Sequence, residues 1–403
     1  MEKNEETFAG VRVLEFTTVA AGPLIGTYLS FYGAEVIHVE AERRPDTSRY
    51  LPPAIKDNTN WGYVFASVNT NKYGITLDIT TSQGRELAKK IVAEWADVVI
   101  ENFTPGVIKR NGLGYEELKK ANKNLIMLST CNLGQTGPYA THPGMGSHLH
   151  HLAGFSHLTG WPDRAPVMLF GPYIDYIAVT MATCALLSAL DYRRHTGKGQ
   201  YIDISQLESG LQFMIPVLLE YGVNGREMTR VANQCHYAAP HGAFPCRGDD
   251  RWCIIAVFTD TEWQRFCEVI GQPGLSKHPD FSTLNARKQH ESELDNLISQ
   301  WTATLDAEEV MERLQEAGVE AAVVKGKDLF EDSGYVDSVY KELEHPEAGK
   351  YLTRVLPFTL SKTPQQVKKP FPANLGEDNH YFYTKILGLQ EKAYQSLKET
   401  GII

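Results

Sequence analysis

The stretch VRVLEFTTVAAGPLIGTYLSFYGAEVIHVE, residues 11–40, decides the fold class of this 403-residue chain. It opens with a β-prone run at 11–16 and closes with a second one at 35–40. Between them, Gly22-Pro23 begins a helical pattern that Gly33 ends. A strand, a helix and a strand within about 30 residues are typical of a βαβ unit, in which the two strands are parallel.

The same alternation continues downstream of this unit. A helical pattern begins at Ser82, and short buried-type strands are expected at 98–100 and 125–129. The first ~130 residues therefore predict an α/β fold with a doubly wound, Rossmann-like parallel sheet. Further on, the sequence predicts a long apolar helix from Asp175 to about Tyr192, a strand at 201–204 and a second apolar helix from 206 to about 221.

The texture of the sequence changes after this helix. Residues 222–236 are polar and loop-like, and the following pattern predicts a small α+β region. Its expected elements are strands at 252–258 and 320–324 and helices near 261–271, 286–304 and 307–317. A prior of ~150 residues per domain allows two or three domains. We divide the chain into the N-terminal part of a large α/β domain (1–225), a small α+β domain (230–330) and a C-terminal segment (345–403).

Composition excludes several classes of protein. The net charge of −10 argues against general binding to nucleic acid or to an anionic membrane. The six cysteines form no C-x-x-C pair and are interpreted as reduced, mostly buried thiols. The N-terminal residues do not predict a secretion signal, and no uninterrupted apolar run predicts a membrane span. We therefore expect a cytoplasmic protein.

Common cofactor and catalytic motifs are missing. The first βα turn, TTVAAGPLIG, lacks the G-x-G-x-x-G spacing of dinucleotide enzymes, and neither a P-loop nor a G-x-S-x-G elbow is present. His148, His150 and His151 form a cluster without a neighbouring cysteine or carboxylate. Because a four-coordinate metal site needs more ligands at consistent spacing, we interpret them as histidines at a helix start or in a loop.

Asp175 is the carboxylate of most interest. It follows Gly171-Pro172 and precedes a long apolar helix, with no basic residue beside it. One interpretation is a helix N-cap, a position that favours Asp. The other is a nucleophile at a helix N-terminus that its apolar neighbours partly desolvate. The local sequence leaves both interpretations open.

A series of motifs in fixed order resembles the family III CoA-transferases, which include formyl-CoA and carnitine CoA-transferases. Each motif is weak alone, and their order over nearly the whole chain makes the resemblance specific. They are VRVLEF…AAGP (11–23), GAEVIHVE (33–40), NTNKYGITLD (69–78), ADVVIENFTPGV (96–107), GQTGPYA (134–140), TGKGQYIDIS (196–205), GVEAAVV (318–324) and LGEDN (375–379).

The resemblance implies a large domain built from both ends of the chain and an interlocked dimer of like or related subunits. It implies that the substrates are an acyl-CoA thioester and a carboxylic acid, with no permanently bound cofactor and no metal. Asp175 aligns with the catalytic aspartate of the family, which would act as a covalent nucleophile. The positions that align with contacts to CoA or its thioester are Ala20, Ala21, Lys72, Asn102, Phe103 and Arg110.

Some positions depart from the pattern of the family. Ala20 stands where related transferases often have a polar side chain, and Gly144-Met145-Gly146 replaces a Gly-Tyr/Phe-Asp sequence. With the stretch 157–167, these features are similar to the benzylsuccinate CoA-transferase group. That similarity implies succinyl-CoA as donor and an aryl-substituted succinate as acceptor, with a carnitine-like or other small acid as the alternative. Aromatic residues that could hold a ring are Phe155, Trp161, Tyr173 and Tyr176.

Three other functions stay open. An α-methylacyl-CoA racemase shares the fold and the aspartate but needs a second acid/base after the GQTGP loop. Met145 occupies that aligned position, so His148 or His150 would have to substitute. The chain could also be a supporting subunit of a transferase with two unlike chains, or a protein that binds CoA without turnover. Deuterium exchange, activity of the purified chain alone and trapping of an aspartyl adduct distinguish them.

Overall fold

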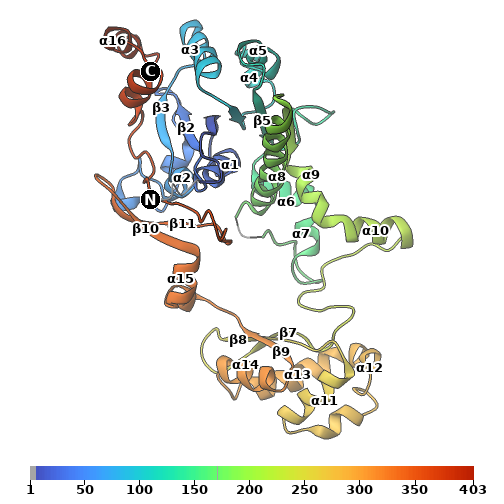
Figure 1. The fold of residues 1–403 in the computed structure, drawn as a ribbon. Helices are drawn as coiled ribbons and strands as arrows, with labels where there is room; N and C mark the ends of the chain where they lie inside the picture. The colour runs from blue at the N-terminus through green and yellow to red at the C-terminus, as the bar shows by residue number, and fades with distance from the viewer. Residues whose placement is uncertain (1–5, 170) are drawn as a thin grey trace. The chain divides into compact units, whose positions relative to one another are not determined.

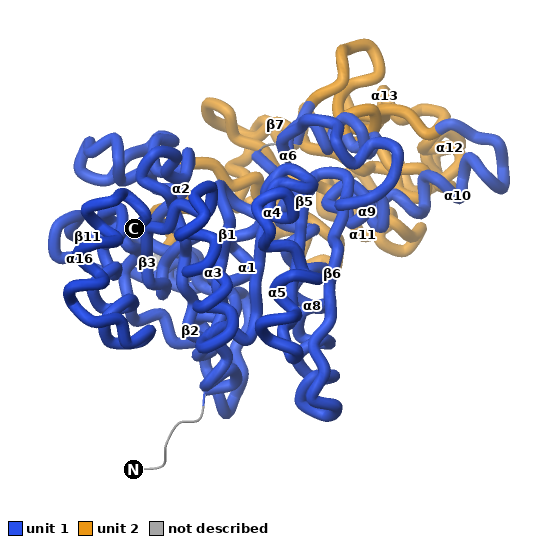
Figure 2. Tube along the Cα trace, turned by 90° about the horizontal axis from the view of Figure 1, so that it is seen from above, with its two compact units in different colours: residues 1–155, 168–227, 334–403 blue, residues 156–167, 228–333 orange. Residues whose placement is uncertain are grey.

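The computed structural model describes residues 6–169 and 171–403, so residues 1–5 of the N-terminal segment lie outside it. The chain divides into two compact units (Figure 2). Unit 1 comprises residues 1–155, 168–227 and 334–403, and unit 2 comprises residues 156–167 and 228–333. The segment 156–167, which we had assigned to the large domain, thus groups with unit 2.

Unit 1 is built on a six-stranded parallel sheet, which confirms the doubly wound α/β prediction (Figure 1). The strand order is β3-β2-β1-β4-β5-β6. The central strands β1 and β4 are neighbours, and the chain winds outward from them in both directions, so their carboxyl ends form the topological switch point of the sheet. The strands are β1 (Arg12–Phe16), β2 (Glu35–Glu40), β3 (Tyr73–Thr76), β4 (Val98–Glu101), β5 (Ile126–Cys131) and β6 (Tyr201–Ser205).

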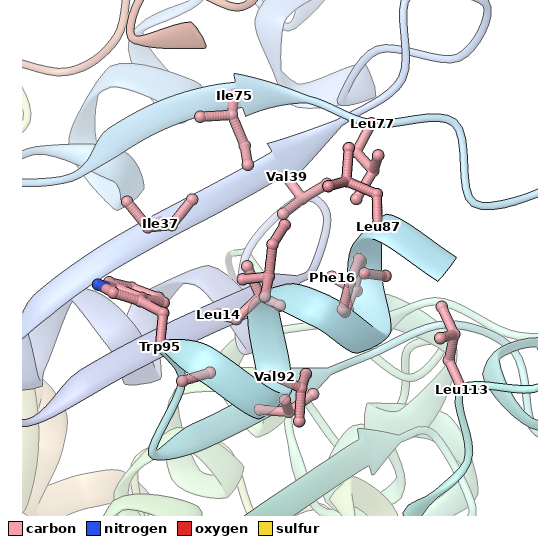
Figure 3. Packing of buried hydrophobic residues seen from close by; sticks show 14 of the residues in the cluster. Leu14, Phe16, Ile37, Val39, Ile75, Leu77, Leu87, Val92, Trp95 and Leu113 are labelled. Atoms are coloured by element: carbon pink, nitrogen blue, oxygen red, sulfur yellow. The ribbon is translucent and has the colours of Figure 1, made fainter. Parts of the chain in front are cut away.

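Helices cover both faces of this sheet because successive side chains of a strand point to opposite sides. In β4, Val99 joins one apolar core, whereas Val98 and Ile100 join the other. Helices α3 (Ser82–Glu94), α5 (Tyr115–Ala121) and α16 (Glu391–Glu399) pack on the first core, in which Leu14, Ile37, Ile75 and Trp95 meet (Figure 3). The second core contains residues of α1 (Ala21–Ser30) and α8 (Tyr173–Thr196).

Helix α8 is long and apolar enough, by length and composition alone, to cross a membrane. One face of it packs in the second core, where Val179, Ala182, Leu186 and Ala189 are buried. It begins two residues before Asp175 and ends at Thr196, and the next residue, Gly197, has the positive φ of 69° that is common just after a helix.

Shorter elements surround the sheet of unit 1. The apolar helix expected over 206–221 is interrupted at 212–214 and forms two helices, α9 and α10. The remaining elements are α2 (Tyr63–Asn69), α4 (Val107–Arg110), α6 (Gly146–Leu152), α7 (Phe155–Leu158), α9 (Gln206–Leu211), α10 (Ile215–Asn224), α15 (Ser333–Val339), β10 (Tyr340–His345) and β11 (Gly349–Arg354), of which α7 and α15 span the boundaries between the units.

Side chains of the LGEDN motif form hydrogen bonds with β3, the edge strand of the sheet. Asp378 Oδ2 accepts the N–H of Gly74, and Asn379 Oδ1 accepts the N–H of Thr76, each at 2.8 Å. Both donors belong to β3, which lies at the edge of the sheet. An edge strand exposes unpaired backbone groups that invite pairing with another chain. The C-terminal segment therefore returns to unit 1 and satisfies that edge with side chains.

Unit 2 is a small α+β unit. A three-stranded antiparallel sheet packs with four helices around a core that includes Trp263 and Phe266. The helix expected over 286–304 is broken at His290. The elements are β7 (His241–Pro245), β8 (Trp252–Ala256), β9 (Glu320–Val323), α11 (Asp260–Val269), α12 (Leu284–Gln289), α13 (Glu291–Thr302) and α14 (Ala307–Glu316).

Candidate active site

The loops after β1 and β4 are joined by side-chain hydrogen bonds at the switch point. Asn102 accepts the N–H of Thr18 with Oδ1 and donates Nδ2 to the carbonyl of Thr18, both at 2.8 Å. The carboxylate of Asp46 accepts the N–H of Val19 at 3.1 Å. Val19 has a positive φ of 65°, a conformation that β-branched residues rarely adopt. Asn102 and Asp46 therefore hold this loop in a strained conformation.

The held loop leads into the start of α1. Ala20 and Ala21 are buried there, so their side chains offer little surface to a ligand. At Gly22, a Cβ atom would lie 2.8 Å from Cγ of Asn102, which requires glycine at this close approach. Ligands of open α/β sheets bind outside the carboxyl ends of the strands at the switch point. This loop is where that rule places a substrate.

The segment after β4 combines a buried carboxyl with an exposed cation. Glu101 is buried, and its Oε2 accepts the N–H of Phe103 at 3.0 Å. Burial raises the pKa of Glu101 to about 7 against the opposing hydrogen bonds from Ser129 and Phe103. Arg110 is exposed at the end of α4, without an ion-pair partner in the described part of the chain, and remains available to an anion.

Lys72 lies in the interior and not at the edge of the sheet. Its side chain is fully buried, and Nζ donates to Glu15 Oε2 at 2.7 Å, to the carbonyl of Pro23 at 2.6 Å and to Asn69 Oδ1 at 3.1 Å. An ammonium group has three donors, so all of them are used. In this position Lys72 ties β1 to the first turn of α1 and has no donor left for a phosphate.

Asp175 is the third residue of α8 and not its N-cap. The N-cap position is held by Pro172, and no side chain of that residue caps the helix. The Oδ1 atom of Asp175 is buried and lacks a hydrogen-bond partner within residues 6–169 and 171–403. Desolvation by burial raises the pKa of Asp175 to about 6. The interpretation of Asp175 as the helix N-cap is therefore wrong, and its Oδ1 is not used in a hydrogen bond within the described residues.

Helix α6 packs against this carboxylate. A Cβ atom at Gly146 would lie 2.4 Å from Oδ1 of Asp175, so only glycine fits between the helix and the carboxylate. Further along α6, Nε2 of His150 accepts the N–H of Ile174 at 3.1 Å. His148 instead accepts the N–H of Met145 through Nδ1 at 3.1 Å. Both histidines are thus engaged by backbone groups at helix starts.

Aromatic rings gather beside the start of α8. Phe155 and Tyr173 meet edge to face at 6.2 Å between ring centroids, and the ring of His150 lies 6.3 Å from Tyr173. Tyr173 and Met145 are exposed. Of the other two expected aromatic residues, Trp161 belongs to unit 2, and Tyr176 has the guanidinium carbon of Arg354 at 5.5 Å from the centre of its ring.

A cavity of about 350 Å³ lies elsewhere, at the carboxyl ends of β2 and β3. Its lining includes Arg43 and Asp78, whose side chains form an ion pair at 3.0 Å, and the C-terminal residues 401–403. Because its one cation is already paired, this cavity is a poor anion site, and Asp175 does not line it.

Sequence reasoning proposed Asp175, Asn102 and Arg110 as site residues but did not propose three other parts of this candidate site. Asp46 and Glu101 carry no distinctive spacing, although Glu101 stands beside Asn102 in the ENFTPG motif. The close approach of Gly146 to Asp175 also escaped it, because a glycine required by a contact looks like any other in a sequence.

Comparison with known proteins identifies the class of enzyme. Residues 8–379 match CoA-transferase family III, and the chain belongs to this family. It is similar to a succinyl-CoA–D-citramalate CoA-transferase of Chloroflexus aurantiacus, with 36% identity over 98% of this chain and 97% of the relative. It is also similar to the beta subunit of a succinyl-CoA–L-malate CoA-transferase from that organism, with 31% identity over 98% of both chains.

The fold comparison agrees with this assignment. The crystal structure of a CaiB/BaiF family protein from Brucella suis superposes with a TM-score of 0.85 and 29% identity, covering 95% of this chain and 100% of the other. The chain is therefore a CoA-transferase that acts on a CoA thioester and a carboxylic acid.

Proposed function

We propose that this chain transfers CoA from succinyl-CoA to a 2-substituted succinate, with Asp175 as covalent nucleophile. The observation that carries the proposal is the buried Oδ1 of Asp175 at the start of α8, which has no hydrogen-bond partner among the described residues. A carboxylate oxygen that accepts no hydrogen bond keeps its electron pairs available for attack on a thioester. Its raised pKa of about 6 still leaves it mostly ionised at neutral pH.

The reaction proceeds by two exchanges on the same carboxylate. Asp175 attacks the thioester carbonyl, the C–S bond breaks, and a mixed anhydride and CoA thiolate form. The thiolate attacks the aspartyl carbonyl, releases succinate and leaves an aspartyl-CoA thioester. The acceptor carboxylate then attacks this thioester and expels the thiolate. Attack of the thiolate on the acceptor carbonyl gives the new acyl-CoA and regenerates Asp175. No net proton is consumed.

Binding of CoA is assigned to the switch point. Arg110, which has no ion-pair partner among the described residues, supplies a cation for a phosphate, and Phe103 offers a half-buried ring at the same edge. Asn102 acts by holding the loop at Thr18, because both ends of its amide are engaged there. The backbone near Ala20 and Ala21 then faces the thioester. Lys72 stabilises the start of α1, which follows this loop, because its Nζ donates to the carbonyl of Pro23.

The proposed acceptor acid rests on the acids named for the relatives and on the side chains that lie near Asp175. The relatives named above act on citramalate and malate, which are succinates substituted at C2. Near Asp175, the exposed apolar side chains of Met145 and Tyr173 favour an apolar substituent. An aryl group such as that of benzylsuccinate fits this surface through ring packing with Tyr173 and Phe155.

The decisive experiment traps the intermediate. The purified chain is incubated with succinyl-CoA and hydroxylamine, and peptide mass spectrometry locates the modified residue. We expect a hydroxamate at Asp175, and we expect neither adduct nor transfer in Asp175→Ala. A panel of benzylsuccinate, citramalate, malate and carnitine then ranks acceptors by kcat/KM. Transfer by Asp175→Ala within tenfold of the wild-type rate would refute the nucleophile.

The alternative functions give different results in the same experiment. A racemase would incorporate solvent deuterium at the α-carbon of an acyl-CoA without any acceptor acid. The structure offers it little support, because His148 and His150 each accept a backbone N–H. A supporting subunit would form no adduct alone and would gain activity with a related chain. A protein that only binds CoA would show binding without an adduct under either condition.

A further inference from the structure

We infer that His150 is a positioning residue that caps the N–H of Ile174 and thereby leaves the carboxylate of Asp175 free to attack. The inference rests on the proposed nucleophilic role of Asp175. It assigns a function to a histidine that the reaction itself does not use.

The argument begins with the orphan donors of α8. The first N–H groups of a helix have no partner inside the helix, and an Asp in the first turn is normally drawn to them. Pro172 stands at the N-cap without a side-chain acceptor. The N–H of Asp175 donates to the carbonyl of Pro172 at 3.0 Å. The N–H of Ile174 also needs an acceptor. If no other acceptor were present, it would donate to the neighbouring carboxylate of Asp175.

His150 supplies that acceptor from another helix. Its side chain is fully buried, and its Nε2 accepts the N–H of Ile174 at 3.1 Å. Only a neutral imidazole has an accepting nitrogen, so the remaining proton lies on Nδ1. Burial and the neighbouring His151 lower the pKa of His150 and keep it neutral. Nδ1 is itself buried without a partner in the described residues.

The same short helix also shapes the space around the carboxylate. Gly146 at the start of α6 approaches Oδ1 of Asp175, and His150 one turn later fixes the adjacent residue, Ile174. Asp175 is thus held through its backbone and not through its carboxylate. This division keeps the nucleophile in place without a hydrogen bond that would weaken it.

The test compares three substitutions of one side chain. His150→Leu keeps the bulk and removes the acceptor, and His150→Asn keeps an amide that is too short to reach. His150→Gln restores an acceptor oxygen at a reach similar to that of Nε2. We expect the first two to lower kcat and the rate of hydroxamate formation about ten- to hundredfold, with KM for succinyl-CoA within about twofold of wild type. His150→Gln should recover the rate to within about threefold.

Leu152→Ala is the matched control, because Leu152 is an exposed residue of the same helix. It should leave kcat unchanged. If His150→Leu fails to fold, the comparison of His150→Asn with His150→Gln decides the question. Equal adduct rates in wild type, His150→Asn and His150→Gln would overturn the positioning role while leaving the nucleophile intact. A wild-type chain that forms no adduct would instead overturn the nucleophile, and this inference with it.

Discussion

At the scale of single residues, ionised Asp175 lowers the free energy of unfolding of the protein. Burial raises the pKa of Asp175 from 3.8 to about 6. Between these two values the folded chain holds the proton more tightly than the unfolded chain. The free energy of unfolding therefore falls as the pH rises through this window, and the loss is complete above it. A shift of this size corresponds to roughly 2 to 3 kcal/mol.

Asp175→Asn should therefore stabilise the protein while abolishing transfer. We expect the variant to be more stable than wild type by roughly 2 kcal/mol at pH 7.5 and nearly equal to it at pH 4. Urea unfolding at both pH values measures the difference. In the wild type, the rate of hydroxamate formation should rise with pH through about 6 as Asp175 ionises. A less stable Asp175→Asn at pH 7.5 would contradict the desolvation argument.

Lys72 poses a second question at this scale, since the resemblance implies a contact with CoA and the geometry gives it a buried ion pair with Glu15. Lys72→Met should cost roughly 3 to 5 kcal/mol, because it leaves the buried Glu15 with only the more distant His38, whose Nδ1 lies 3.6 Å from Oε2. The double variant Glu15→Gln/Lys72→Met should lose less than the single one. Lys89→Met, which breaks an exposed pair with Glu86, is the control and should change stability by less than about 1 kcal/mol.

The measurement for this pair is urea unfolding combined with KM for the CoA thioester in the folded fraction. If Lys72 only supports the fold, KM stays within about twofold of wild type in any folded variant. An increase of tenfold or more in KM, without loss of stability, would show that Lys72 contacts the CoA thioester.

At the scale of elements, the LGEDN segment explains why the C-terminal part of the chain returns to the sheet. Asn379→Ala removes the acceptor of the Thr76 N–H and the bond from Nδ2 to Oγ1 of Thr76. An unsatisfied buried donor costs roughly 1 to 3 kcal/mol, and an uncovered edge favours association. We expect lower stability in urea and faster aggregation by light scattering. Asn60→Ala, an exposed substitution in unit 1, should have neither effect.

Some elements were predictable from sequence and others were not. The runs at 11–16, 35–40 and 98–100 are buried on both faces and rich in Val, Leu, Ile and Phe, and this composition marked β1, β2 and β4. Strand β3 has only four residues, YGIT, and was not predicted from the sequence. Its outer edge is completed by the side chains of Asp378 and Asn379, which accept the N–H groups of Gly74 and Thr76. A local pattern cannot reveal a partner 300 residues away.

The same limit applies to the site. Asp175 and Asn102 lie in recognisable motifs, whereas the burial of Lys72 depends on Glu15, and the role of His150 depends on the N–H of Ile174 in another helix. Each of these contacts joins residues that are distant in sequence. Residue type gave the chemistry that was possible, and only the packing decided which group was engaged and which was left for the reaction.

At the scale of the whole molecule, α10 is unexplained by a single chain. None of its residues is buried, yet its sequence, IPVLLEYGVN, is largely apolar. Leu218, Leu219 and Val223 are each more than half exposed. Contiguous exposed apolar patches mark interfaces. We propose that a second copy of this chain covers it, as the resemblance to interlocked dimers implies, or a related subunit like those of the malate transferase.

Light scattering of the purified chain tests this assembly. We expect about 90 kDa, twice the chain mass of 45.1 kDa. Leu219→Glu/Val223→Glu places two charges where burial would cost several kcal/mol, so the mass should fall towards that of one chain and activity should fall with it. Phe330→Glu, which charges an equally exposed apolar side chain in unit 2, is the control and should remain dimeric. A wild-type chain of 45 kDa that transfers CoA unaided would show that α10 serves neither assembly nor catalysis through a partner.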